Sequence, residues 1–168
     1  MKTFVQSQFN YCPLTWMFHN RTMNNKINRL HERALRIVYN DDNLTFTQLL
    51  QIDNSVTIHH RNLQRLAIEM YKAKNHLSPL PMQELFSEQT NPHNLRKMRC
   101  WDVPKVRTVY NGTETIRFRG PKIWSIVPTE IKNSNSLTEF KYIIKGWKPS
   151  ECTYRLCKTY VQNLGFIN

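Results

Sequence analysis

The chain has 168 residues, 40% of them hydrophobic, and a formal net charge of +12 at pH 7. This length suits one ordinary domain or two small ones, and the apolar content is enough for a modest core. No window approaches the ~18 apolar residues of a membrane-spanning helix, and the first seven residues lack the apolar run of a secretory signal. We therefore expect an intracellular protein, in the nucleus or the cytoplasm, with no membrane partner.

The positive charge is concentrated in the second half of the chain. Residues 1–90 carry 10 Lys/Arg against 7 Asp/Glu, whereas residues 91–168 carry 14 against 5. Such asymmetry favours a polyanion partner, RNA or DNA, because each cation placed on a phosphate releases condensed counterions. The alternative is a soluble surface with spare lysines.

The first half, residues 1–87, is expected to form three to four helices, beginning with an apolar segment that extends to about Phe18. An apolar stripe at helical spacing predicts a helix that ends near Tyr39. The stripe consists of Met23, Ile27, Leu30, Ala34, Ile37 and Val38. Thr45 and Gln48 have the spacing of a capping box, which predicts a second, short helix, and a longer one is expected over residues 56–77. A last short turn of helix is expected over residues 82–86.

The tetrapeptide Tyr39-Asn40-Asp41-Asp42 matches the Tyr-x-Asp-Asp box by which reverse transcriptases hold two catalytic metal ions. A polymerase box needs its aspartates at a turn between two strands, with a further metal-binding aspartate upstream. Here a helical pattern precedes the box, and no acidic residue precedes Glu32. We therefore interpret Asp41 and Asp42 as part of a solvated turn rather than as metal ligands.

The second half is expected to contain a β-hairpin between residues 95 and 118. β-favouring residues alternate there with basic ones, and Tyr110-Asn111-Gly112-Thr113 is a turn signal. With a three-residue loop, Val106, Thr108, Ile116 and Phe118 share one face of the ribbon. The basic residues Lys105, Arg107, Arg117 and Arg119 then share the other face, which either follows a phosphate backbone or is simply solvated.

The chain is expected to close on a helix opened by a capping box, Ser136 with Glu139, and to end that helix before Pro149. The predicted fold is thus α+β: a helical region at 1–87, a linker at 88–94, and a basic α/β region at 95–168. Gly120-Pro121-Lys122 is interpreted as a turn rather than a phosphate loop.

Cys152 and Cys157 are weak candidates for a zinc site. Zinc needs four ligands, and no Cys or His follows Cys157, so a pair of reduced thiols is the alternative that we favour. No Gly-rich phosphate cradle or nucleophile motif is present, so independent catalysis is not expected.

Several ordered blocks of the sequence resemble the region that follows the catalytic palm in jockey-like non-LTR retrotransposon reverse transcriptases. They are residues 7–14, 16–19, 25–39, 54–62, 66–72, 120–124 with Pro128, 131–132, 136–137 with 140–141, and 156–160. The resemblance covers nearly the whole chain. It implies that the polymerase palm lies upstream of Met1, in a longer protein in which Met1 falls inside a continuous helix.

The resemblance implies a thumb and tail region that carries no catalytic residue of the RNA-directed DNA polymerase and no cofactor of its own, with Mg²⁺ held only by the full-length enzyme. It further implies contacts with the nucleic-acid backbone. We expect these contacts from a set of eight residues: Arg29, Arg33 and Arg36 in the first half, and Lys105, Arg107, Arg117, Arg119 and Lys122 in the second. The alternative is a stand-alone protein-interaction or structural module that docks or self-associates through an exposed apolar face over residues 4–18.

Overall fold

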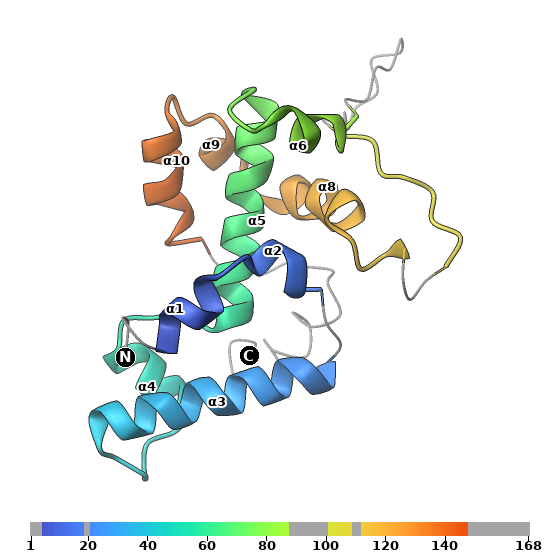
Figure 1. Cartoon of the computed structure of the whole chain (residues 1–168). Coiled ribbons are helices and arrows are strands. Elements are labelled where there is room, and N and C mark those ends of the chain that lie inside the picture. The colour runs from blue at the N-terminus through green and yellow to red at the C-terminus, as the bar shows by residue number, and fades with distance from the viewer. Residues whose placement is uncertain (1–4, 19–20, 88–100, 109–111, 148–168) are drawn as a thin grey trace. The chain divides into compact units, whose positions relative to one another are not determined.

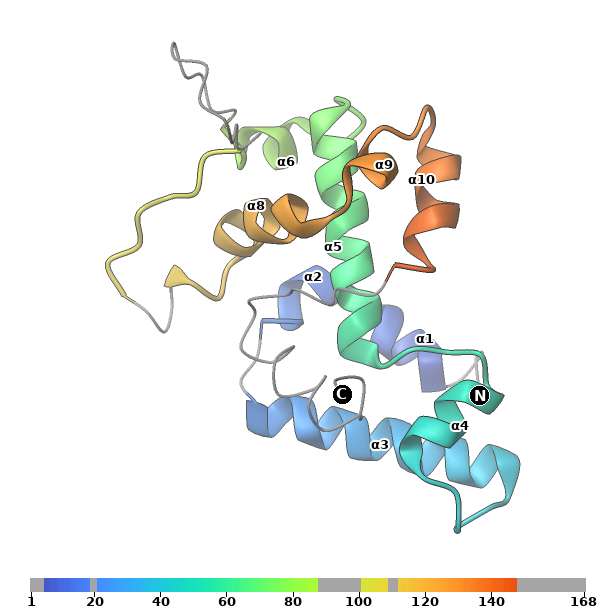
Figure 2. The same cartoon turned by 180° about the vertical axis from the view of Figure 1, so that it is seen from behind.

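The computed structural model describes residues 5–18, 21–87, 101–108 and 112–147. Its helices, shown in Figures 1 and 2, are α1 (Val5–Asn10), α2 (Pro13–Trp16), α3 (Arg21–Tyr39), α4 (Phe46–Ile52), α5 (Ile58–Lys74), α6 (Leu80–Glu84), α8 (Ile116–Ile126), α9 (Thr129–Lys132) and α10 (Leu137–Ile144). These residues fall into two compact units, which meet in sequence between Asn62 and Leu63, inside α5.

The helical character predicted for the first half is confirmed, but its described residues form six helices, α1 to α6, instead of three to four. Helix α3, which carries the predicted apolar stripe, ends at Tyr39. At the start of α4, the Thr45 hydroxyl accepts a hydrogen bond from the backbone amide of Gln48, and the Gln48 side chain accepts one from the backbone amide of Thr45. This capping box satisfies two of the amides that the first turn of a helix leaves without partners.

The predicted β-hairpin is wrong, because the part of the chain that the structure describes is helical and contains no strand. Ile116 and Phe118, expected in the second strand, form the first turn of α8, and Gly120-Pro121-Lys122, expected as a turn, lies within the same helix. The fold class is therefore corrected from α+β to helical for these residues. Part of the predicted turn at 110–113 lies outside the described residues. The predicted linker at 88–94 lies wholly outside them, so the predicted domain limits stay a prediction.

The core of the first unit is small and lies between α3 and α4, which pack together in both views (Figures 1 and 2). Leu35, Leu49 and Leu50 are buried in it, and partly buried Tyr39, Leu44 and Phe46 surround them. Such burial stabilises by about 25 cal/mol per Å² of apolar surface, and a loss of one of these leucines would leave a cavity.

Helix α3 turns an unexpected face inward. Its buried residues are Asn24, His31 and Leu35, whereas the predicted stripe leaves Leu30 58% and Ile37 75% exposed. The spacing thus identified the helix correctly but not the side that packs. The polar inner face includes the side-chain amide oxygen of Asn28 and both ring nitrogens of His31. None of these atoms has a hydrogen-bond partner among the described residues.

The second unit is built around the part of α5 that follows Asn62, with α8 and α10 on either side of it (Figures 1 and 2). The Tyr71 ring stacks on Phe140 of α10 with centroids 4.3 Å apart, and the Tyr71 hydroxyl donates to the Ser134 carbonyl at 2.9 Å. The Gln64 amide nitrogen donates to the carbonyls of Lys145 and Trp147. These long-range hydrogen bonds fix the end of α10 to α5.

Gly120 allows α8 to approach α5 closely. A β-carbon at this position would lie 2.6 Å from the Met70 sulfur and 3.1 Å from the Phe86 ring. The glycine is therefore needed for packing, although it weakens a helix interior by up to about 1 kcal/mol. Pro121 follows it inside the helix and is buried, so α8 also lacks one backbone hydrogen bond.

The predicted cap of the last helix is confirmed at its serine. The Ser136 hydroxyl accepts from the Glu139 amide at 3.1 Å, while the Glu139 carboxylate accepts from the Asn135 amide instead of the Ser136 amide. Phe140 and Ile144 of α10, and Trp147 after it, are buried. Among the described residues, no helix has both the length and the apolar character needed to cross a membrane.

Candidate nucleic-acid interface

The predicted backbone-binding residues of the first unit form one side of α3. Arg29, Arg33 and Arg36 follow one another at spacings of four and three, so they lie along the same face of the helix. Lys26 stands three positions before Arg29 and extends the row, and we define the basic face as these four residues. Sequence reasoning missed Lys26, although the same spacing identifies it.

Within the basic face, Arg36 has a structural role and the other three do not. Its guanidinium binds the Glu32 carboxylate at 2.9 Å and also donates to the Asp42 carbonyl, and its side chain is half-buried. Lys26, Arg29 and Arg33 are exposed and make no ion pair with a described residue. Since Glu32 is the only acidic residue of α3 and is occupied by Arg36, the exposed part of this face is positive throughout.

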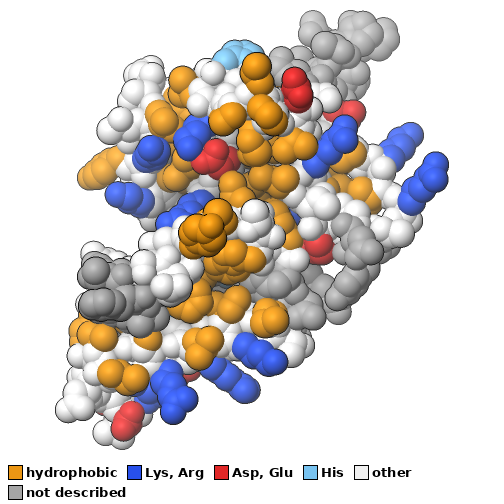
Figure 3. Space-filling model, in the orientation of Figure 1, with side chains coloured by type: hydrophobic (Ala, Val, Ile, Leu, Met, Phe, Trp, Pro, Cys, Tyr) orange, Lys and Arg blue, Asp and Glu red, His pale blue; other side chains and the backbone are white. Residues whose placement is uncertain are grey.

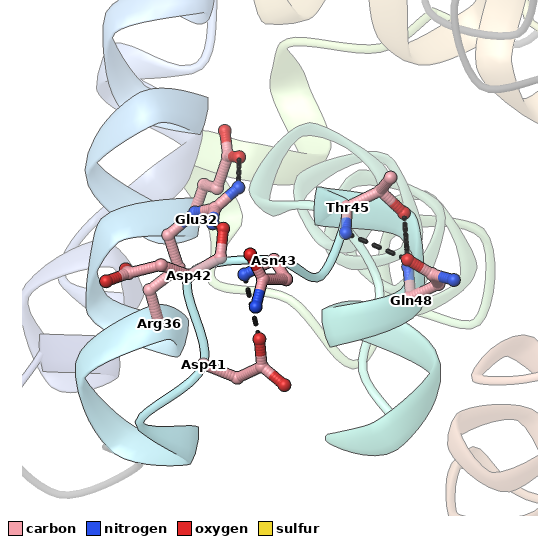
Figure 4. Close-up of polar contacts among 7 residues, drawn as sticks. All are labelled: Glu32, Arg36, Asp41, Asp42, Asn43, Thr45 and Gln48. Carbon is pink, nitrogen blue, oxygen red and sulfur yellow. Dashed lines mark hydrogen bonds and ion pairs between the residues drawn. The ribbon is translucent and has the colours of Figure 1, made fainter.

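The Tyr-x-Asp-Asp tetrapeptide forms the turn that follows α3, as predicted. Tyr39 is the last residue of α3, and Asn40 adopts a left-handed conformation with φ 50°. The Asp41 carboxylate accepts from the Asn43 amide at 2.8 Å, and Figure 4 shows this contact beside the Arg36–Glu32 ion pair and the Thr45–Gln48 cap. The aspartates thus close a turn, with no strand on either side among the described residues.

The side chain of Tyr39 contacts Asp53 and not the aspartates of its own tetrapeptide. Its hydroxyl donates to Asp53 at 2.9 Å, and this hydrogen bond to the charged acceptor raises the pKa of Tyr39 above its usual value. Among the described residues, no group of three or more His, Cys, Asp and Glu side chains is placed to hold a metal ion. The weak zinc candidates Cys152 and Cys157 lie outside the described residues.

The basic residues predicted on the hairpin do not share one face. Arg117 and Arg119 are two positions apart in α8, which places them about 200° apart around the helix. Arg117 is exposed, whereas Arg119 is half-buried and pairs with Glu114. Lys105 and Arg107 are exposed in the irregular segment 101–108. The predicted four-cation face is therefore wrong, because the helix spreads side chains that a strand would have aligned.

Lys122, the last of the predicted residues, lies over the Phe118 ring at 4.0 Å. This cation–π contact, one turn away on α8, keeps the ammonium against its own helix. In the second unit, the predicted residues that face solvent are thus Lys105, Arg107 and Arg117.

The apolar segment proposed as a docking face is largely covered. Of the large side chains described between residues 6 and 18, Tyr11 is exposed, Phe9, Leu14, Trp16 and Phe18 are half-buried, and Met17 is buried. The indole nitrogen of Trp16 donates to the Tyr11 carbonyl at 2.8 Å. Self-association through this segment stays a prediction.

Comparisons with known proteins add no relative: no protein-family description, no curated protein and no solved structure matches this chain. The geometry of the basic face is therefore the observation from which a function can be argued.

Proposed function

We propose that this chain is the post-palm C-terminal region of a jockey-like non-LTR retrotransposon reverse transcriptase and that it contacts nucleic-acid backbone through the basic face of α3. The resemblance of the ordered sequence blocks supports the family, and the helical first half agrees with a thumb. The observation that carries the binding proposal is the row of exposed cations formed by Lys26, Arg29 and Arg33 on one 19-residue helix.

Spacing and charge suit this face to phosphates. Successive cations are separated by three or four residues, or about 5 Å along the helix axis. Long, flexible side chains at that spacing can each reach a phosphate, and such contacts position a nucleic acid without reading its sequence. Binding through this face is therefore electrostatic and weakly sequence-specific, with Lys105, Arg107 and Arg117 as further contacts from the second unit.

The salt dependence of RNA affinity tests the proposal. We expect the affinity of the full chain for a single-stranded RNA to fall steeply with salt, at a slope of about 0.7 for each phosphate contact. The double variant Arg29→Gln, Arg33→Gln should reduce the slope by about 1.4. The matched control Lys141→Gln, Lys145→Gln removes two exposed cations near the end of α10 and should leave the slope unchanged. A flat salt dependence, or an equal loss in the control, would contradict the proposal.

The family assignment has its own test in the genomic sequence upstream of Met1. An open frame that encodes an apolar strand, a Tyr/Phe-Ala-Asp-Asp turn and another strand would identify the chain as part of a polymerase. Stop codons directly upstream, with a transcript that starts there, would mean that the chain is expressed alone and would favour the second candidate function below. The isolated chain is not expected to extend a primer, because no catalytic residue of the family carries over.

The second candidate function is the stand-alone interaction module derived from such an element. The exposed apolar residues of α3 favour it, since a surface of this kind is more typical of a protein contact than of a nucleic-acid contact. The two functions use different sides of the same helix.

A further inference from the structure

Helix α3 carries an apolar surface that the described residues of the first unit leave exposed. We define the outer face as Ile27, Leu30, Ala34, Ile37 and Val38. Leu30, Ile37 and Val38 are 58%, 75% and 48% exposed, while Ile27 and Ala34 are half-buried. Figure 3 shows hydrophobic side chains along α3 with Lys and Arg side chains beside them. A monomer rarely leaves several large aliphatic side chains of one helix in water without a binding role.

The spacing of the outer face fits another helix. Ile27, Leu30, Ala34 and Ile37 follow one another at intervals of three, four and three residues. This alternation forms the narrow seam that packs against a second helix, side chain into gap. The face contains no aromatic ring, whereas single-stranded nucleic acids stack their bases on aromatic side chains. A helix of a protein is therefore the occupant that the outer face fits.

The charges beside the seam select the kind of helix. Lys26 and Arg33 each stand four positions before a seam residue, Leu30 and Ile37 respectively, so both lie along the same edge. Both are exposed, and no exposed acidic residue of α3 compensates them. Charged residues along such an edge determine which partner is accepted, because opposite charges attract across it and like charges repel.

The same charges disfavour a second copy of this chain. An antiparallel pair of α3 helices, centred on Leu30, would place Lys26 of one copy beside Arg33 of the other, twice. A parallel pair would place each basic row against the opposite edge of the partner helix, which carries no acidic residue to attract it. The last residues of the chain, 153–168, contain two basic residues and no acidic one, so they do not offer the complementary charge either.

We propose that the outer face of α3 is the docking surface for an amphipathic helix of another protein, with aliphatic residues at its contacting positions and acidic residues along its flank. This inference does not depend on the nucleic-acid proposal, because the outer face and the basic face lie on adjacent sides of α3 and only Lys26 and Arg33 border both.

The test uses a defined synthetic helix. A fluorescent peptide of about three heptads, with Leu at the contacting positions and Glu at the flanks, is titrated with the full chain and followed by anisotropy. Two control peptides are compared with it. One has Leu at the contacting positions and Lys at the flanks, and the other has Gln at the contacting positions and Glu at the flanks. We expect the first peptide to bind and both controls to bind at least about tenfold more weakly, since seam and flank each contribute.

Variants of the protein locate the site. Leu30→Gln, Ile37→Gln should reduce the affinity for the acidic Leu peptide by about tenfold or more without lowering the melting temperature, because both side chains face solvent and Gln favours helix. The matched control Tyr142→Gln removes a side chain that is 79% exposed on α10 and should have no effect. Lys26→Glu, Arg33→Glu should reverse the preference toward the Lys-flanked peptide.

Other outcomes would overturn the inference. If the Leu peptides with Glu and with Lys flanks bind equally well, the contact is hydrophobic and does not depend on charge. If the Gln peptide with Glu flanks binds as well as the Leu peptide with Glu flanks, charge alone causes the binding. A dimer in sedimentation that Leu30→Gln, Ile37→Gln abolishes would identify a second copy as the occupant. Loss of RNA affinity in that variant would assign the outer face to nucleic acid, whereas unchanged RNA affinity with lost peptide binding separates the two proposals.

Discussion

The imidazole of His31 packs edge-on against the ring of Phe46, with centroids 5.6 Å apart and planes at 82°. The histidine is 1% exposed, and neither ring nitrogen has a hydrogen-bond partner among the described residues. An imidazole in this position is accommodated as a neutral ring. Burial lowers the pKa of His31 to about 4, with the nearby charge of Arg61 acting in the same direction and Asp53 opposing it.

This depressed pKa predicts a loss of stability in mild acid. Above pH ~6.5 the ring is neutral in both the folded and the unfolded chain. As the pH falls toward 4, the unfolded chain binds a proton that the folded chain does not, so stability should decrease by roughly 3 kcal/mol over this range. His31→Leu should flatten the pH dependence of the melting temperature. An imidazole resonance of His31 that titrates near pH 6.5 in the folded protein would contradict this prediction.

The close contact at Gly120 predicts that two glycines respond differently to alanine. Gly120→Ala should destabilise the protein by about 1–3 kcal/mol, because the new methyl group overlaps the Met70 sulfur. Gly146→Ala should be neutral or slightly stabilising, since its nearest neighbour would be the Ile143 carbonyl oxygen at 3.6 Å. Urea unfolding of both variants measures the difference. A smaller cost of Gly120→Ala in a Met70→Ala background than in the parent, measured as a double-mutant cycle, would identify Met70 as the source of the clash.

Two arginines of α3 should differ in role, Arg36 supporting the structure and Arg33 binding nucleic acid. Arg36→Gln should lower stability by about 1 kcal/mol, because it leaves the Asp42 carbonyl and Glu32 without their cation. Arg33→Gln should leave stability within about 0.5 kcal/mol and weaken RNA binding instead. Thermal melts and RNA titrations on both variants measure the two effects. The prediction fails if Arg36→Gln proves as stable as the parent.

The contact between Tyr71 and α10 predicts a graded series. Tyr71→Phe keeps the ring stack on Phe140 and loses only the hydrogen bond to Ser134, so it should cost about 1 kcal/mol. Tyr71→Ala should cost about 3–5 kcal/mol, because it also leaves a cavity. Tyr142→Phe, at an exposed position of the same unit, should leave the unfolding midpoint unchanged. Equal unfolding midpoints for Tyr71→Phe and the parent would show that the hydroxyl of Tyr71 does not contribute to stability.

The sequence by itself determined the features that depend on neighbours along the chain. Thr45 and Gln48 cap α4, and Ser136 caps α10, because a side-chain oxygen reaches an amide three residues away in any tertiary context. The end of α3 at Tyr39, and with it the interpretation of the Tyr-x-Asp-Asp tetrapeptide as a turn, followed from the same local patterns.

Only the tertiary structure decided what depends on distant partners. The alternation of Ile116, Arg117, Phe118 and Arg119 favoured a strand, but so short an alternation also fits one turn of helix. In the structure this segment is helical, and Gly120 of the same helix packs against Met70 and Phe86, which lie more than thirty residues earlier in the chain. Similarly, spacing predicted an apolar stripe on α3, but burial of its polar side against α4 left that stripe exposed. Periodicity identifies the faces of a helix, whereas the partner that covers a face lies elsewhere in the chain or in another molecule.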